Sequence, residues 1–422
     1  MRILQINTHA GQGGAGRVMC RLHHALNRRG HRSRIVARSR AQKEANVYCL
    51  DDVTRIRPPV LMRIVRGLGW RIDKWFDVPT LHLTTRRLLA SRLFQTSDVI
   101  HLHNLHGRYF NYHLLPALTA AKPTVWTLHD MWAFTGHCAY SYECDRWRKG
   151  CHHCPLLKPN KRALVEPGPT LVDRTRQVWR RKRVIYRHSR FSVVTPSRWL
   201  QRLAQESIVG EGRTVHFIPN GVDLEVFKPI ERVQARAHFG IPQEARVILF
   251  AAEKTTSKRK GFLYLLQALD RLRDPAVVLV VMGKPSDRSL PPRFRVVELG
   301  FIQDEVTQSL AYNAADLFVF PSLADNQPLV LIEALACGTP VVAFDAGGIP
   351  EMVRHMETGY LARYKDAADL SHGIETLLND EEMHCRMRIR CRQIAEAEYG
   401  LDLQAERYLE LYEQILQRGG WR

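Results

Sequence analysis

The amino-acid sequence predicts an α/β protein built from two doubly wound domains, each a parallel sheet covered by helices on both faces. The chain has 422 residues, which is too long for one ordinary core and fits two domains of roughly 200 residues each. Short apolar runs alternate with amphipathic stretches, and such repeated strand–helix–strand units favour a parallel sheet. Hydrophobic residues make up 45% of the chain and charged residues 25%, a balance that excludes an intrinsically disordered protein.

The first half of the chain contains strand-like runs with helical stretches between them. The segments at 16–30 (GRVMCRLHHALNRRG) and 197–208 (SRWLQRLAQESI) repeat apolar residues at the spacing of an amphipathic helix. Five runs have the character of strands, namely RILQIN at 2–7, SRIVAR at 33–38, DVIHLH at 98–103, TVWTLHD at 124–130 and SVVTPS at 192–197.

The second half shows the same alternation more regularly. Helices are expected over 261–272, over 304–315 with Asp304 as the N-cap, and over 329–340, where Gly338 forms a left-handed cap and Pro340 prevents continuation. The strands between them are VILF at 247–250, VVLVVMG at 277–283, VVELGF at 296–301, LFVFPS at 317–322 and VVAF at 341–344.

The domain boundary is predicted where the apolar order breaks down, in the segment DLEVFKPIERVQ around 223–235. We therefore assign residues 1–225 to the first domain and residues 226–398 to the second. The final segment, 399–422, contains the amphipathic helix LQAERYLELYEQIL, which lies beyond the expected end of the second sheet and is predicted to brace the first domain.

The chain is strongly basic, with 62 Lys and Arg against 42 Asp and Glu and a net charge of +20. Such an excess indicates an acidic partner, which leaves nucleic acid, an anionic membrane surface or a phosphorylated substrate open, or a basic solvated surface without a dedicated partner. Neither a secretory signal nor an apolar run of about 20 residues is present, so we expect a cytoplasmic protein.

Two basic segments interrupt the first domain. Residues 55–76 mix Arg and Lys with Trp70, Trp75 and Phe76, the composition of a helix at a membrane interface. Two interpretations stay open for both segments: contact with an anionic membrane, or amphipathic helices packed on the core with arginines outward. The second segment, 174–190, carries eight cations, at Arg174, Arg176, Arg180, Arg181, Lys182, Arg183, Arg187 and Arg190.

Four of the nine cysteines lie close together in GHCAYSYECDRWRKGCHHCP. The last two have the two-residue gap of zinc knuckles, and four thiolates suffice for a closed tetrahedral site. We predict a structural zinc site, with an iron–sulfur cluster and four free thiols as alternatives, and with His137, His152 and His153 as competing ligands. The four cysteines are Cys138, Cys144, Cys151 and Cys154.

Two further features suggest a nucleotide and a sugar. The loop GQGGAGR follows the first strand, and its glycines allow a phosphate to approach the backbone at a helix N-terminus. Asp325 lies in the loop after LFVFPS, and Glu333 follows seven residues later inside the next helix. Carboxylates so placed accept paired hydrogen bonds from vicinal hydroxyls, as on a ribose or a hexose.

The motifs of this chain resemble, in the same order, those of the retaining glycosyltransferases of family four, the group 1 glycosyltransferases. Besides the glycine loop and the two carboxylates, the matching motifs are TLHD at 127–130, PSR at 196–198, IPNGVD at 218–223, RKG at 259–261 and GGIPE at 347–351. The resemblance covers nearly the whole chain and implies the GT-B fold, in which two Rossmann-like domains face a central cleft and the C-terminal helix crosses back to the first domain. In that fold the first domain serves the acceptor and the second binds the nucleotide sugar. The stretch DNQPLVLIEALACGTP and the cysteine cluster after TLHD are similar to the subgroup that builds bacterial exopolysaccharides such as colanic acid.

The resemblance also implies roles for single residues. Glu333 would hold the ribose hydroxyls, and Asp325, where the family usually has a glutamate, would contact the donor sugar. Lys260 would clamp the diphosphate, and its usual arginine partner is absent, so that Lys254, which we favour, or Arg259 would replace it. The resemblance thus implies a catalytic set of His129, Asp325 and Lys260. On the acceptor side it implies His103, Asn104 and Asp130. The donor-binding residues would be Gly13, Gly14, Lys254, Arg259, Asn326, Pro328, Leu329 and Glu333.

The histidines of HLHNLH at 101–106 stay open to another interpretation. Alternation along a strand places His101 and His103 on the same side, which permits a metal pair, although acceptor-pocket or core histidines fit the same pattern.

The function expected from all this is metal-independent transfer of a hexose from a nucleotide-diphosphate sugar to a glycan or a lipid-linked oligosaccharide, in cell-surface polysaccharide biosynthesis. Peripheral contact with the inner face of the plasma membrane would fit a lipid-linked acceptor, and no nucleic-acid partner is expected. One alternative is a nucleic-acid-binding protein that uses its charge and a zinc knuckle. Another is a GT-B-like enzyme of a different reaction, a phosphorylase or an epimerase.

Overall fold

The computed structural model describes residues 1–54, 83–107, 109–157, 172–254, 257–272, 276–284 and 294–417. The chain divides into two compact units: unit 1 comprises Met1–Ile218 and Gln404–Arg422, and unit 2 comprises Pro219–Leu403. The division lies close to the boundaries predicted at 225 and 399, and the basic segment 55–76 lies outside the described residues.

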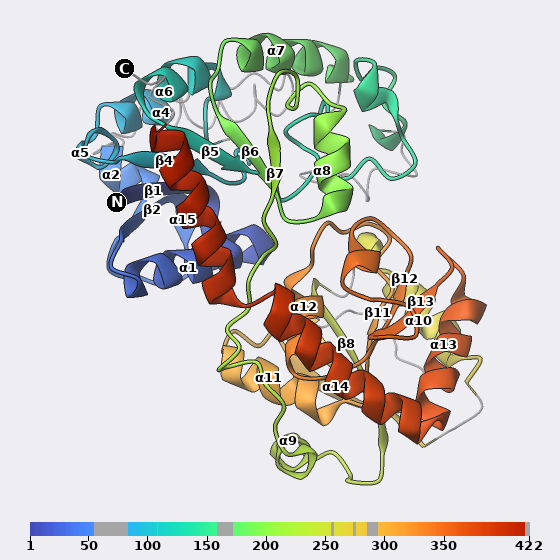
Figure 1. The fold of residues 1–422 in the computed structure, drawn as a ribbon. Coiled ribbons are helices and arrows are strands. Elements are labelled where there is room, and N and C mark those ends of the chain that lie inside the picture. Colours follow the sequence, from blue (N-terminus) through green and yellow to red (C-terminus); the bar gives the residue numbers. More distant parts are fainter. Residues whose placement is uncertain are drawn as a thin grey trace, which may run out of the picture. The chain divides into compact units, whose positions relative to one another are not determined.

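Unit 1 is built on a seven-stranded parallel sheet with the strand order β3-β2-β1-β4-β5-β6-β7 (Figure 1). The strands are β1 (Arg2–Ala10), β2 (Arg32–Arg40), β3 (Val47–Cys49), β4 (Val99–Leu102), β5 (Thr124–Thr127), β6 (Ser192–Thr195) and β7 (Val215–Phe217). The helices are α1 (Gly13–Arg28), α2 (Leu50–Thr54), α4 (Leu83–Leu89), α5 (Arg92–Gln95), α6 (Leu115–Ala121), α7 (Thr175–Arg187), α8 (Arg198–Gln205) and, from Gln404 on, α15 (Leu401–Gln417).

Unit 2 repeats the scheme with six parallel strands in the order β10-β9-β8-β11-β12-β13. The strands are β8 (Arg246–Lys254), β9 (Val277–Lys284), β10 (Arg295–Gly300), β11 (Leu317–Phe320), β12 (Val341–Phe344) and β13 (Gly359–Ala362). The helices are α9 (Arg232–His238), α10 (Phe262–Leu269), α11 (Glu305–Ala314), α12 (Leu329–Ala336), α13 (Ala367–Asn379) and α14 (Glu381–Glu398).

The strand order reverses direction once in each sheet, between β1 and β4 in unit 1 and between β8 and β11 in unit 2. In doubly wound sheets ligands bind at this switch point, outside the carboxyl ends of the strands. The loops that follow β1 and β4, and those that follow β8 and β11, are therefore the places where a functional site is expected.

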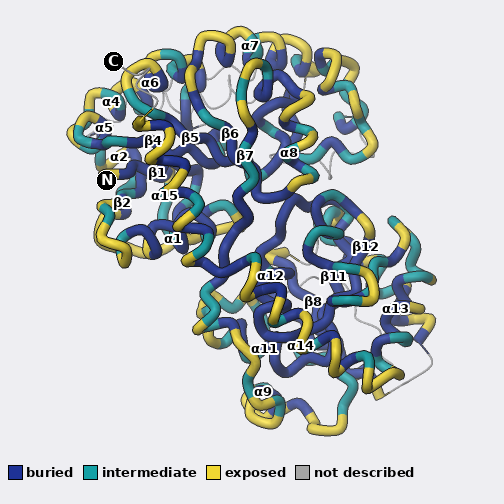
Figure 2. The backbone as a smooth tube through the Cα atoms, in the orientation of Figure 1, coloured by how far each residue is buried: buried dark blue, intermediate teal, exposed yellow. Residues whose placement is uncertain are grey.

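Four inner strands are buried along their whole length, and they appear dark in Figure 2. Every residue of β4, β5, β11 and β12 is buried, because helices cover both faces of the sheet. This explains why these strands appear in the sequence as short continuous apolar runs. The predicted pair of doubly wound α/β domains is confirmed.

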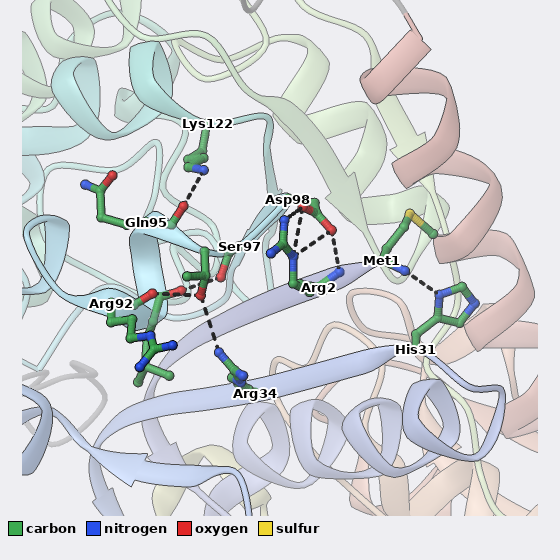
Figure 3. Close-up of polar contacts among 11 residues, drawn as sticks. Met1, Arg2, His31, Arg34, Arg92, Gln95, Ser97, Asp98 and Lys122 are labelled. Carbon is green, nitrogen blue, oxygen red and sulfur yellow. Dashed lines mark hydrogen bonds and ion pairs between the residues drawn. The ribbon is translucent and has the colours of Figure 1, made fainter.

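The amino ends of β1 and β4 are tied together by a polar cluster (Figure 3). The backbone amide of Arg2 donates to a carboxylate oxygen of Asp98 at 2.7 Å, and the Arg2 guanidinium lies 2.6 Å from the other carboxylate oxygen. Beside them the ammonium of Lys122 donates to the carbonyl oxygen of Gln95 at 2.8 Å. One ion pair and several hydrogen bonds thus close this edge of the sheet, whereas the opposite edge carries the motifs.

Helix α15 completes unit 1. The hydroxyl of Tyr412 lies 2.7 Å from Nδ1 of His101, and the hydroxyl of Tyr408 lies 2.8 Å from the hydroxyl of Thr127. Both tyrosines are buried, so the C-terminal helix contributes to the core of this unit.

The helix boundaries follow the predicted signals. The side chain of Asp304 accepts a hydrogen bond from the amide of Thr307 and caps α11. Gly338 follows α12 with a φ of 70°, the left-handed conformation that ends a helix without a Cβ penalty.

The basic segment 174–190 forms α7, and Lys182 is its one buried cation. Val178, Trp179, Ile185 and Tyr186 are also buried on this helix, so it packs on the core with its arginines at least partly exposed. Within the described residues, no helix is both long and apolar enough to cross a membrane.

Candidate functional site

The candidate site of unit 2 lies at its switch point. The loop after β8 contains a short 3-10 turn, Lys258–Lys260, and the loop after β11 runs from Pro321 to Pro328, where α12 begins. The two loops are far apart in sequence, yet they meet because β8 and β11 are neighbours in the sheet.

Asp325 is the centre of a cluster of charged side chains, and only 6% of its surface is exposed. One carboxylate oxygen, Oδ2, accepts hydrogen bonds from Lys260 at 2.9 Å, from Arg259 at 3.0 Å and from the hydroxyl of Ser322 at 2.6 Å. The Arg259 guanidinium also donates to the carbonyl oxygen of Ala324 at 2.9 Å. Two cations from one loop are thus held against one carboxylate from the other.

The electrostatics of this cluster favour a bound anion. Burial raises the pKa of Asp325, but the nearby charges of Lys260 and Arg259 and the hydrogen bonds outweigh it, and the pKa lies below its ordinary value. Asp325 is therefore ionised at neutral pH, and two cations facing one carboxylate leave one excess positive charge. The side chains of Arg259 and Lys260 are only 13% and 19% exposed, so solvent screens that charge weakly.

Two glycines allow the loops to approach this closely. Gly261 has a φ of 72°, and a Cβ there would lie 1.8 Å from the carbonyl oxygen of Pro321. Gly347, in the GGIPE motif, has a φ of 61°, and a Cβ there would lie 2.2 Å from the carbonyl oxygen of Asp325. The RKG and GGIPE motifs thus fix the backbone around the carboxylate.

The structure places Arg259, and not Lys254, beside Lys260. Lys254 is exposed at the end of β8, whereas the Arg259 side chain is mostly buried on Asp325. Of the two candidates for the missing arginine, Arg259 has the position of a partner to Lys260.

Glu333 is fully buried inside α12, where it accepts a hydrogen bond from the hydroxyl of Tyr312 on α11 at 3.1 Å. The start of the same helix is formed by Pro328 and Leu329, with no side-chain cap. Just before it, Gln327 is bound by Asn220 of the IPNGVD motif, whose backbone amide donates to the Gln327 side-chain oxygen at 2.6 Å.

The switch point of unit 1 carries the glycine loop. Gly13 and Gly14 are exposed at the start of α1, and a Cβ at either position would meet open space. The N-cap residue, Gln12, makes no side-chain cap. The backbone is therefore accessible here, as the approach of a phosphate requires.

The histidines that follow β4 and β5 form a hydrogen-bonded series. His103 is fully buried; its Nδ1 lies 2.9 Å from Nε2 of His129 and its Nε2 lies 3.1 Å from the side-chain oxygen of Gln5. His101, also fully buried, lies with its Nε2 2.7 Å from the Thr127 hydroxyl. His101 and His103 are thus core histidines with hydrogen-bond partners, whereas His106 and His129 are half-buried.

Asp130 forms a hydrogen bond with His106, and its charge also acts on His129. Its Oδ2 lies 3.1 Å from Nε2 of His106, and its Oδ1 accepts from the backbone amide of Trp132 at 2.8 Å. His129 is paired with His103 instead. The backbone amide of Asn104 donates to the side chain of Asn7 at 3.0 Å, which fixes the loop after β4.

Burial keeps these histidines neutral. It lowers the pKa of His101 to about 3 and that of His129 to about 4, and it lowers the pKa of His103 well below its ordinary value. Between these values and the ordinary pKa of about 6.5, the unfolded chain binds protons that the folded chain does not. The free energy of unfolding must therefore fall as the pH drops below about 6.5.

We expect unit 1 to lose stability as the pH is lowered from 7.5 to 5. Below the ordinary histidine pKa, each such histidine lowers the equilibrium constant for folding by up to about tenfold per pH unit. All eight tryptophans lie outside residues 219–403, so tryptophan fluorescence during urea unfolding reports on unit 1 alone. H103Q, which cannot titrate, should flatten the pH dependence, while the same change at the exposed His188 should leave it unaltered. A pH-independent unfolding midpoint would contradict the assignment.

The comparisons with known proteins agree with this geometry. Residues 12–226, more than half of the chain, match the family model described as Glycosyltransferase Family 4. Residues 245–380 match the model described as Glycosyl transferases group 1. The chain belongs to glycosyltransferase family 4. It is therefore an enzyme that transfers glycosyl groups.

Relatives within and around the family match the chain over most of its length. WcaC of Escherichia coli (strain K12), named for glycosyl transfer in colanic acid biosynthesis, is 27% identical over 379 residues, which cover 84% of this chain and 85% of that protein. Sucrose-phosphate synthase from Thermosynechococcus elongatus is 19% identical in sequence, with a TM-score of 0.69. The match covers 99% of this chain and 100% of that structure's chain. HepE of Anabaena in complex with UDP is 17% identical in sequence, with a TM-score of 0.67. The match covers 98% of this chain and 100% of the HepE chain. These structures confirm the GT-B fold of the family.

Sequence reasoning missed several residues of the site. Ser322 binds Asp325, Tyr312 binds Glu333, and the side chains of Asn220 and Gln327 join two motifs. The only signal for Asn220 was its place in IPNGVD, and no spacing in the sequence indicates Ser322 or Tyr312.

Proposed function

We propose that this glycosyltransferase transfers a hexose, with retention of configuration, from a nucleotide-diphosphate sugar to a glycan or a lipid-linked oligosaccharide. The observation that carries the proposal is the cluster of Lys260 and Arg259 on Asp325 at the switch point of unit 2. It offers partly buried cations to a diphosphate and a carboxylate to sugar hydroxyls.

The chemistry explains why the cations are needed. Cleavage of the bond between the sugar and the phosphate leaves negative charge on the departing diphosphate, and fixed cations and helix N-termini stabilise that charge in the transition state. Lys260 and Arg259 would supply the cations, and the start of α12 at Asn326, Pro328 and Leu329 would supply backbone dipoles. Catalysis would then need no metal ion, and a departing phosphate oxygen would accept the acceptor's proton.

In unit 1, Gly13 and Gly14 would take a phosphate and His129 would contact the donor sugar. Because its pKa lies at about 4, His129 is neutral at pH 7 and would act as a hydrogen-bond partner. His103 holds it through the 2.9 Å contact between their ring nitrogens. On the acceptor side we keep His103, Asn104 and Asp130 as positioning residues, since all three are engaged in fixed hydrogen bonds.

The likeness to WcaC supports a role in cell-surface polysaccharide biosynthesis, and the complex of HepE with UDP supports a nucleotide-diphosphate donor. A lipid-linked acceptor would bring the enzyme to the inner face of the plasma membrane, where the exposed arginines of α7 would meet anionic headgroups.

The two carboxylates should have separable effects. We expect Glu333→Gln to weaken nucleotide binding about tenfold or more, because the ribose would lose a charged acceptor. Asp325→Asn should mainly lower the rate of transfer. Titration calorimetry with the nucleotide and a transfer assay measure the two effects, and Tyr312→Phe, which removes only the hydroxyl bound to Glu333, controls for packing. Equal and small effects of both changes would remove the carboxylates from the donor site.

The first experiment is a thermal-shift panel with UDP, GDP, dTDP, ADP and CMP. A ligand at a hundredfold excess over its dissociation constant stabilises the folded protein by about 2.7 kcal/mol. A shift with one nucleotide that Glu333→Gln abolishes would support the proposal and name the donor class. The absence of any shift at millimolar concentration would overturn the donor assignment. Product formation with free phosphate in place of an acceptor would indicate a phosphorylase.

A further inference from the structure

The four clustered cysteines of unit 1 line one small cavity in the loop that follows β5. Cys138, Cys144, Cys151 and Cys154 contribute to its wall, together with Trp147 and Leu156. Cys138 is buried and the other three are half-buried. The segment from Cys138 to Leu157 contains only two short 3-10 turns, Arg146–Arg148 and Pro155–Leu157, and no strand.

The size of the cavity matches a single ion. Its volume is about 20 Å³, enough for one water-sized particle.

Backbone amides point at the sulfur atoms. The amide of Gly136 donates to Sγ of Cys151 at 3.2 Å, and the amides of Leu156 and Leu157 hydrogen-bond Cys154. N–H donors placed beside the sulfur atoms are the kind of outer partners that orient the ligands of a metal site.

The same loop holds three residues other than glycine in the left-handed region. Tyr142, Cys151 and His153 have φ values of 51°, 37° and 46°. Each such residue costs on the order of 1–3 kcal/mol and persists only where the surroundings fix it. Their concentration among the four cysteines indicates that something besides local preference holds this loop.

We propose that Cys138, Cys144, Cys151 and Cys154 bind one Zn²⁺ ion as a structural site. In this structure no three of the four sulfur atoms lie within 4.8 Å of one another. Zinc–sulfur bonds of about 2.3 Å place the sulfur atoms of a tetrahedral site about 3.8 Å apart, so binding draws the loop inward. With four thiolates the ion has no open position, and its role is to hold the loop.

The loop is connected directly to the motif that carries His129. The backbone amide of Met131 donates to the carbonyl oxygen of Ala139 at 2.8 Å, and the Thr135 hydroxyl donates to the carbonyl oxygen of Cys138 at 2.6 Å. Lys182 donates to the carbonyl oxygens of Trp132 and Thr135. A zinc ion on Cys138 therefore fixes the segment 131–138 that follows Asp130.

Metal analysis of the purified, untagged protein tests the proposal. We expect about one zinc per chain and no iron or acid-labile sulfide in the wild type. C144S and C154S should lose the zinc, while C49S, a cysteine of similar burial in the same unit and outside the cavity, should keep it. H137N and H152N should also keep it, and loss of zinc from either would replace one thiolate by a histidine in the ligand set.

A second measurement needs no variant. In the wild type a chelator should release zinc and four reactive thiols together, and tryptophan fluorescence should show a lower unfolding midpoint for unit 1. Folded protein that contains no zinc, takes up none and exposes the four thiols without a chelator would overturn the proposal. This test is independent of the donor and the acceptor, so its failure would leave the proposed transfer reaction standing.

Discussion

Lys260→Ala is expected to lower kcat by about 100- to 1000-fold, which corresponds to the loss of about 2.7–4 kcal/mol of transition-state stabilisation when one fixed donor is removed. The reason is the position of the ammonium, 2.9 Å from Asp325 and mostly buried, where its charge is poorly screened. Because the lysine would act on charge that develops during cleavage, KM for the donor should change less than kcat. Steady-state kinetics with the donor identified by the nucleotide panel measures both.

Lys258→Ala is the matched control, because Lys258 lies in the same 3-10 turn and is exposed. It should leave kcat within about twofold, as expected of an exposed charge. Arg259→Ala should cost more than Lys254→Ala, since only Arg259 lies on Asp325. A Lys260→Ala enzyme with unchanged kcat would show that the cluster does not stabilise the leaving group, whatever its role in binding.

Gly261→Ala is expected to destabilise unit 2 by about 2–4 kcal/mol, the sum of left-handed strain and of overpacking. The new Cβ would lie 1.8 Å from the carbonyl oxygen of Pro321, which is backbone and cannot rotate away. The loops of Lys260 and Asp325 would separate, so nucleotide binding should weaken as well. The thermal unfolding midpoint and the nucleotide-induced shift measure the two effects.

Gly240→Ala separates the clash from the strain. Gly240 has a φ of 64° in the same unit, but a Cβ there meets nothing within 4 Å. It should therefore show only the strain, about 1–2 kcal/mol, and unaltered nucleotide binding. Equal destabilisation by the two changes would mean that the loops can move apart at no cost.

The fold was largely predictable because buried parallel strands appear as short apolar runs. The runs 247–250, 277–283, 317–322 and 341–344 all became strands of unit 2. The strands β3, β7 and β13 were not predicted, since they are three or four residues long and lie at or next to the edges of their sheets, where few apolar residues are needed.

The candidate site was predictable as a set of residues but not as a set of contacts. The sequence indicated Asp325, Lys260 and Arg259, and the parallel sheet explains why their loops meet. The mutual ion pairs depend on side-chain geometry that no spacing encodes. For the same reason no spacing in the sequence indicates the hydrogen bond between Asp130 and His106.

Unit 1 is completed by a segment that follows all of unit 2 in the sequence. The ribosome delivers residues 1–218 first, but Tyr408 and Tyr412, which bind Thr127 and His101 in the core, emerge after all of unit 2. Unit 2 is continuous in sequence and can fold while synthesis continues, which reverses the usual order in which the amino-terminal domain folds first. A chain that ends before Gln404 therefore lacks the hydroxyl partners of Thr127 and His101 and leaves apolar surface of unit 1 uncovered, and we expect it to be cut by proteases more readily than the full chain.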